Sequence, residues 1–220
     1  MDTVVCEADH LSDEEVHFWS SKQVLDKIQS RQESVADAIL RETKPHDLIM
    51  LEGPVERTPL ENLAPYLRQL PKEKREAYVR HADFYADIAE YAKSIGRRVQ
   101  SMDSGLNRRF AELSSYLLGL PPALKEESEL AAHHQRDRIM EKRIKKFTPK
   151  LVVTTREHSY WLLHTIKPRK FISEQGSFEW WQIEGAAKKQ YDIRLEKIAR
   201  LNQLRNKRRT KINQNLKRRK

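Results

Sequence analysis

The chain has 220 residues, of which 34% are charged and 38% are hydrophobic, and its formal net charge is +10. This length is sufficient to bury one sizeable core, and the low hydrophobic fraction indicates that part of the chain lies outside that core. Positions 186–220 hold fourteen Lys and Arg against two acids, whereas positions 1–185 hold 28 bases and 30 acids. We therefore predict a folded domain over residues 1–185 and a basic helical tail over residues 186–220.

Three classes of protein are excluded by composition. The single cysteine, Cys6, excludes an intramolecular disulfide framework and a cysteine-rich zinc site. The first residues lack the basic start and apolar core of a signal peptide. No stretch of the sequence approaches the roughly 20 apolar residues that cross a bilayer. We expect a cytoplasmic protein.

Short apolar runs alternate with longer segments of helical spacing along the chain. The runs predict strands over residues 3–6, 48–51, 99–102 and 151–153, with a further short strand at 171–173. The helical segments are residues 21–42, 60–70, 72–94, 107–118, the stretch from 124 to 147, the stretch after His158, and the tail from about residue 185. This alternation predicts an α/β fold in which a short, mostly parallel central sheet is flanked by long helices, with a basic C-terminal helical extension.

Polar residues follow four of the predicted strands, namely His10, Glu52, Asp103 and His158. In open α/β sheets, groups just past the carboxyl ends of the strands face the ligand crevice. Two imidazoles and a carboxylate suit a divalent transition metal, which would activate a water molecule for hydrolysis. The sequence therefore predicts a metal site with His10, Glu52 and His158 as its ligands.

Each of these residues can also be explained by an ordinary structural role. A histidine after a strand is more often a surface or capping residue than a ligand, and Asp103 is also suited to N-cap the next helix. Glu52 is the most specific of the four, because a carboxylate directly after a buried apolar run needs a partner.

A charged triplet, Arg136-Asp137-Arg138, lies on the predicted helix before the last strand. Either arginine would serve to stabilise an anionic intermediate or to orient the carboxylate ligands. The alternative is that all three residues are solvated surface charges.

The order of these motifs resembles a broad superfamily that includes the TraB/PrgY proteins, the TIKI metalloproteases, the ChaN-like haem-binding proteins and the erythromycin esterases. Those proteins carry G-x-x-H after the first strand, Glu at the end of the second, an R-D-x-x-M helix and a second G-x-x-H. Here the corresponding stretches are EADH at 7–10, LIMLEGP at 48–54, RDRIM at 136–140 and TREH at 155–158. Glu7 and Thr155 stand where the pattern has glycine.

The resemblance covers residues 3–166 and implies an α/β fold related by internal duplication. It further implies a metal-dependent hydrolase, acting on an ester or peptide, in which His10, Glu52 and His158 hold the metal. Arg136, Arg138 and Asp103 would be the catalytic residues. A lineage that kept this fold and altered the activity is the alternative.

The tail predicts a polyanion-binding segment, because clustered Lys and Arg attract phosphate backbones by counterion release. An anionic membrane surface is a second candidate partner. A non-enzymatic protein that binds nucleic acid through the tail is therefore the second functional hypothesis. The residues expected to contact nucleic acid are Arg205, Lys207, Arg208, Arg209, Lys211, Lys217, Arg218 and Arg219.

Overall fold

The computed structural model describes residues 1–8, 18–103 and 122–217, without the side chains of residues 122–129, 205, 209 and 211–217. Within these ranges a six-stranded sheet has the order β3-β2-β4-β1-β5-β6. Every neighbouring pair is parallel except β5 and β6, which are antiparallel. The strands are β1 (Val4–Glu7), β2 (Leu48–Leu51), β3 (Arg98–Ser101), β4 (Leu151–Thr154), β5 (Lys170–Ser173) and β6 (Gly176–Glu179).

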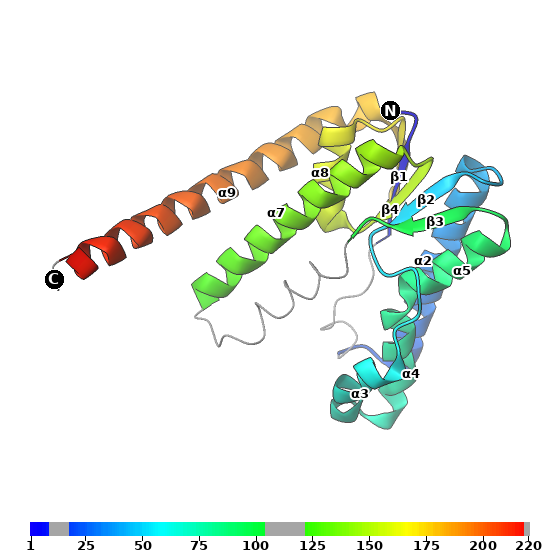
Figure 1. Ribbon diagram of the computed structural model, residues 1–220. Helices are drawn as coiled ribbons and strands as arrows, with labels where there is room; N and C mark the ends of the chain where they lie inside the picture. Colours follow the sequence, from blue (N-terminus) through cyan, green and yellow to red (C-terminus); the bar gives the residue numbers. More distant parts are fainter. Residues whose placement is uncertain (9–17, 104–121, 218–220) are drawn as a thin grey trace.

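Helices cover both faces of this sheet, as Figure 1 shows. They are α2 (Ser21–Glu42), α3 (Leu60–Gln69), α4 (Lys72–Ala82), α5 (Phe84–Ser94), α7 (Pro122–Phe147), α8 (Arg156–Ile166) and α9 (Trp180–Lys217). The helix α2 begins at a capping box, in which Ser20 and Gln23 each accept the other's backbone N–H. The end of α9 extends far from the sheet (Figure 1).

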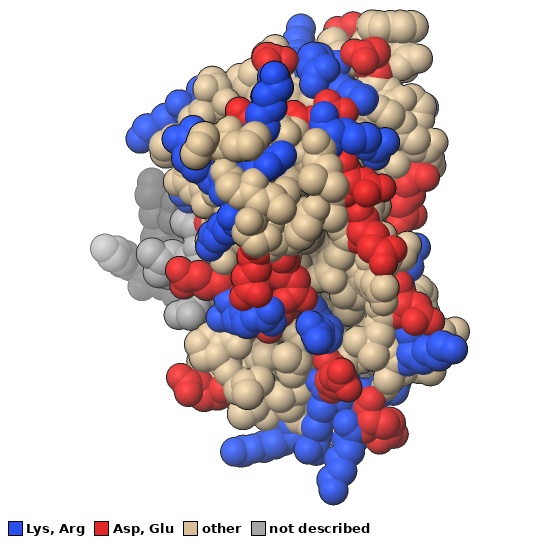
Figure 2. All heavy atoms as spheres, turned by 90° about the vertical axis from the view of Figure 1, so that its right-hand side faces the viewer, with Lys and Arg blue, Asp and Glu red and all other residues tan. Residues whose placement is uncertain are grey.

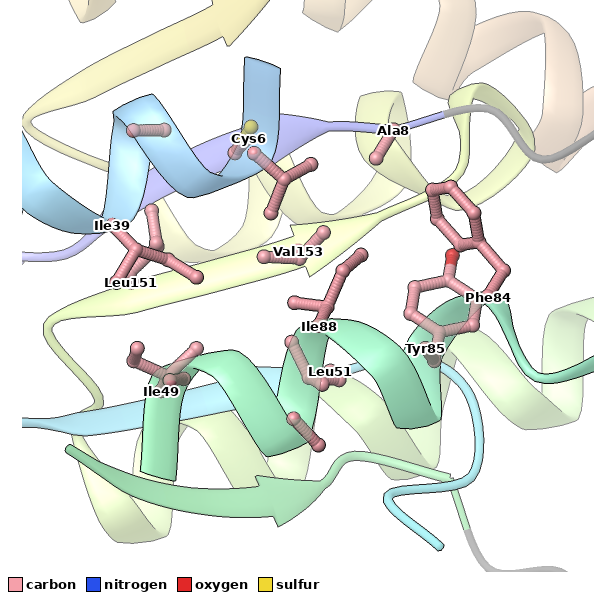
Figure 3. Packing of buried hydrophobic residues seen from close by; sticks show 14 of the residues in the cluster. Cys6, Ala8, Ile39, Ile49, Leu51, Phe84, Tyr85, Ile88, Leu151 and Val153 are labelled. Atoms are coloured by element: carbon pink, nitrogen blue, oxygen red, sulfur yellow. The ribbon is translucent and has the colours of Figure 1, made fainter. Parts of the chain in front are cut away.

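Two hydrophobic clusters fill the spaces between the sheet and its helices. Alternate strand residues point to opposite faces, so Cys6 and Val153 join one cluster while Val5 and Val152 join the other. Figure 3 shows the first cluster, where α2 and α5 pack on β1, β2 and β4. The second cluster packs α7, α8 and the start of α9 on the other face. A sheet covered on both faces accounts for the continuous apolar runs in its strands.

The predicted fold class is confirmed, since the sheet is largely parallel and flanked by helices. Three elements differ from the expectation. The strand β6 was not predicted, because its sequence GSFE is short and mostly exposed. The predicted helix 72–94 is divided at Asp83, whose buried carboxylate accepts the backbone N–H of Thr58. The basic helix begins at Trp180, so the predicted domain boundary falls inside α9.

The carboxyl ends of β1, β2, β3 and β4 lie at one edge of the sheet because these strands are parallel. The helices α2 and α5 pack on one face, and α7 and α8 pack on the other. Open α/β sheets bind ligands at the carboxyl ends of the strands, at the point where the connecting helices change from one face of the sheet to the other. The predicted helix 107–118 lies outside the described residues. Among the described helices, none combines the length and the apolar character that a bilayer crossing requires.

Candidate functional site

His158 lies in the first turn of α8, directly after β4, and is 1% exposed. Thr155 precedes the helix as its N-cap residue. The Nδ1 atom of His158 lies 2.5 Å from Oδ1 of Asp137, which is fully buried on α7. A carboxylate in this position orients the imidazole by accepting a hydrogen bond from Nδ1, and the Nε2 atom lies on the side of Glu52. The histidine is therefore oriented as a ligand or a base would be.

Glu52 follows β2 and is held by donors from β4 and the residue after it. Its Oε2 accepts hydrogen bonds from Oγ1 of Thr154 at 2.9 Å, and from the backbone N and Oγ1 of Thr155 at 2.6 and 2.9 Å. Its Oε1 lies 3.5 Å from Nε2 of His158. Burial of a carboxylate is costly without such partners, so these bonds explain how a Glu can end a buried strand.

Arg136 of α7 links two carboxylates. Its Nη2 donates to Oε1 of Glu52 at 3.3 Å, and its Nε donates to Oδ2 of Asp103 at 2.9 Å. Burial raises the pKa of Asp103, an effect that Arg136 opposes and Glu52 reinforces. Burial alone would lower the pKa of Arg136, but Glu52 and Asp103 outweigh it and raise that pKa. Arg136 therefore remains charged between the two carboxylates.

Arg194 of α9 reaches the same site from the basic helix. Its Nη2 lies 2.8 Å from Oδ2 of Asp137, and its Nη1 donates to the backbone carbonyl of Glu157 at 2.6 Å. Asp137 thus contacts His158 with one oxygen and Arg194 with the other. The side chain of Arg194 is only 18% exposed, so α9 is part of the site.

His158 and two neighbouring side chains form a group that could hold a metal ion. One ligand atom each from His133, Glu157 and His158 lie within 4.8 Å of one another. Burial and the nearby His158 lower the pKa of His133. Within the described residues, Nδ1 of His133 and Nε2 of His158 are buried and have no hydrogen-bond partner. Each nitrogen atom faces a carboxylate beyond hydrogen-bond distance, Glu157 at 3.6 Å and Glu52 at 3.5 Å, and ligation of a metal would satisfy both.

The charges of the site leave a net negative balance. Four carboxylates surround the two histidines, from Glu52, Asp103, Asp137 and Glu157, and the guanidinium groups among them are Arg136 and Arg194. With both imidazoles neutral, these six side chains sum to two negative charges. A divalent cation would neutralise that sum.

The structure brings together Glu52, Asp103, Arg136 and His158, all of which the sequence suggested. The predicted ligand His10 lies outside the described residues. Arg138 is exposed, and within the described part of the chain it forms no hydrogen bond or ion pair with the site carboxylates. Two positions along a helix rotate a side chain by about 200°, so Arg136 and Arg138 cannot both face the site. Arg138 therefore faces away from the described site carboxylates, and its role in a reaction stays a prediction.

The tail residues expected to contact nucleic acid are only partly described. Lys207 and Arg208 are exposed on α9. The side chains of Arg205, Arg209, Lys211 and Lys217 lie outside the described set, as do residues Arg218 and Arg219. Their interaction with nucleic acid stays a prediction.

Sequence reasoning did not identify His133 or Arg194 as site residues, and it treated Asp137 as a surface charge. A pattern on α7 contains the missing information. His133 and Asp137 lie seven and three residues before Met140, and therefore share its face of the helix, which is buried. A polar residue at an apolar position of a helical stripe indicates a buried partner. Arg194 follows the packed Tyr191 by three residues, so it lies on the same inward face of α9.

Searches of protein-family models, of curated proteins and of solved structures found no match to this chain.

Proposed function

We propose that the chain is a metal-dependent hydrolase whose ion is held by His133, Glu157 and His158. One observation supports this proposal above the others. The Nε2 atom of His158 is buried and has no hydrogen-bond partner among the described residues, while Asp137 holds its Nδ1. A histidine oriented by a carboxylate beside further ligand atoms is the usual arrangement of a metal-bound imidazole.

The ligand set fits zinc or a similar transition metal ion. Two imidazoles and one carboxylate leave a coordination position for water, as catalytic zinc sites do. Glu157 is 69% exposed and His133 is 33% exposed, so the site is accessible from solvent on their side. A bound divalent ion supplies Lewis-acid chemistry for hydrolysis.

The remaining residues of the site have roles that follow from their contacts. Oε1 of Glu52 lies beside Nε2 of His158, where it would accept a proton from the attacking water. Thr154 and Thr155 fix the other oxygen of Glu52, and Arg136 compensates its charge. Asp103 holds the far side of Arg136. These four are positioning residues, because each acts through Glu52.

Isothermal titration of the purified, chelator-treated protein with Zn²⁺ and Mn²⁺ tests the proposal. We expect one site per chain in the wild type and loss of that site in His158→Ala. Because His158 is buried, His133→Gln provides a second variant at a more exposed ligand. His134→Gln is the matched control, since His134 is on the same helix and makes an edge-to-face contact with Trp161 instead.

The proposed function fails if the wild type binds neither ion, or if His133→Gln and His134→Gln bind the ion equally well. Thermal unfolding followed by circular dichroism shows which variants are folded, so that a loss of structure is not mistaken for a loss of ligand.

A further inference from the structure

The helix α9 carries exposed cations along one side. At about 100° per residue, Lys189, Lys197, Arg200 and Lys207 fall within an arc of roughly 80° on the helix surface. All four are exposed. The acids of this stretch, Asp192 and Glu196, lie outside the arc by the same geometry. We call these four cations the basic stripe; it spans about 27 Å along the helix.

Arg194 connects the basic stripe to the candidate site. By helical geometry it lies roughly 60° beyond Lys197, outside the arc and toward the side of α9 that packs on the protein. Its guanidinium contacts Asp137 and the backbone of Glu157, a member of the proposed ligand set. A ligand bound along the stripe would run past Arg194, the residue of α9 that contacts the site.

We infer that the basic stripe binds a nucleic-acid backbone and that the bond hydrolysed at the site is a phosphodiester. This inference rests on the proposed hydrolase function and specifies its substrate. In the reaction a water oxygen forms a bond to phosphorus and the bond from phosphorus to one ester oxygen breaks. The proton of the water passes to Glu52, and the leaving alcohol takes a proton from bulk solvent.

A repeating polyanion fits this surface better than a membrane. A helix that lies in a membrane interface needs a continuous apolar face beside its cations. On this side of α9 the exposed apolar residues are Ile193 and Leu204, at 39% and 46% exposure, and cations lie around both. The opposite side of the molecule, formed by α2, α4 and α5, carries Lys and Arg mixed with Asp and Glu (Figure 2).

Fluorescence anisotropy with a labelled single-stranded DNA of about 20 nucleotides tests the binding step. The test variant replaces Lys189, Lys197, Arg200 and Lys207 together by Gln. The matched control replaces Lys22, Lys44, Lys72 and Lys93, which are exposed on or beside α2, α4 and α5, and so removes the same charge. We expect the stripe variant to bind at least about tenfold more weakly, with a salt slope smaller by about three, and the control to resemble the wild type.

Cleavage of the same labelled DNA in the presence of Mn²⁺ tests the substrate. The wild type should cleave it, and His133→Gln should leave it intact while still binding it through the basic stripe. Equal affinities of the stripe variant and the control would overturn the inference. Stripe-dependent binding to phosphatidylserine vesicles without binding to DNA would assign the stripe to a membrane instead.

The two proposals fail in different ways. If the wild type binds the ion in calorimetry and binds DNA but never cleaves it, the substrate assignment is wrong while the metal centre stands. If no ion binds, the hydrolase function itself is wrong, and stripe-dependent DNA binding would identify a non-enzymatic nucleic-acid-binding protein.

Discussion

Arg194 Nη2 lies 2.8 Å from Oδ2 of Asp137, which connects the basic helix α9 to the carboxylate that orients His158. Asp137 is fully buried and the side chain of Arg194 is 18% exposed. The pair therefore makes α9 a structural requirement of the site. Arg194 belongs to the predicted tail and Asp137 to the predicted domain, so this contact joins the two.

Arg194→Met should destabilise the protein by about 3 kcal/mol, because it leaves the buried Asp137 with one partner. This is the low end of the range for a broken buried pair, since Arg194 keeps some exposure. Arg200→Met, on an exposed position of the same helix, should change the free energy of unfolding by less than about 0.5 kcal/mol. Urea unfolding of both variants provides the measurement, and equal stabilities would show that the pair contributes nothing.

Asp137→Asn should weaken metal binding by roughly 10- to 100-fold while leaving the ligand set intact, because the amide no longer fixes the imidazole of His158. Calorimetric titration with Zn²⁺ measures the affinity. Glu141→Gln is the control, since Glu141 lies one turn along α7 and accepts instead from Trp161 and Lys145. A wild-type affinity in Asp137→Asn would contradict the orienting role.

Stability of the metal-free protein should fall as the pH drops below about 6.5, partly because of His133. Burial lowers the pKa of His133 in the folded state from its ordinary 6.5. The unfolded chain then binds more protons than the folded one over the interval between the folded and unfolded pKa values, so acidification favours unfolding. His133→Gln should reduce this slope, as urea unfolding between about pH 7 and 5 would show. If the free energies of unfolding of the wild type and His133→Gln change in parallel with pH, His133 does not cause the slope.

Gly53→Ala should cost about 1–3 kcal/mol and disturb Glu52 next to it. A Cβ at position 53 would lie 2.1 Å from Cδ2 of Tyr85, a buried ring in the first hydrophobic cluster. Gly185→Ala is the internal control, because a Cβ there meets nothing within 4 Å and the residue lies inside α9. That substitution should stabilise the helix by about 0.5–1 kcal/mol. Thermal unfolding of both variants measures the two changes in stability. The prediction fails if both substitutions change the stability in the same direction.

The sheet and half of the site were predictable from local patterns. Apolar runs located five of the six strands, and strand ends in a parallel sheet meet at one edge, which brought Glu52 and His158 together. The inward-facing polar residues of α7 were missed, because neighbouring charges masked their position on the helical face of Met140. Asp137 reads as a solvated charge between two arginines, yet its side chain is fully buried.

Thr155 illustrates a second limit of pattern matching. A glycine was expected there by the resemblance, and glycine usually serves unusual backbone dihedrals. The φ of Thr155 is −75°, which any residue adopts. Its hydroxyl instead donates to Glu52, so the residue contributes a contact that glycine cannot make.

The position of β1 in the sheet determines the order in which the chain can fold. This strand, residues 4–7, is paired on both sides with strands from residues 151–154 and 170–173. During synthesis it therefore has no partner in the sheet until more than two thirds of the chain has been made. Pairings of such long sequence separation close slowly, so nascent chains present an apolar VVC segment to the cell for much of translation. Among the described strands, β1 precedes β2 and β3 in the chain but can pair only after β4 or β5 has been made.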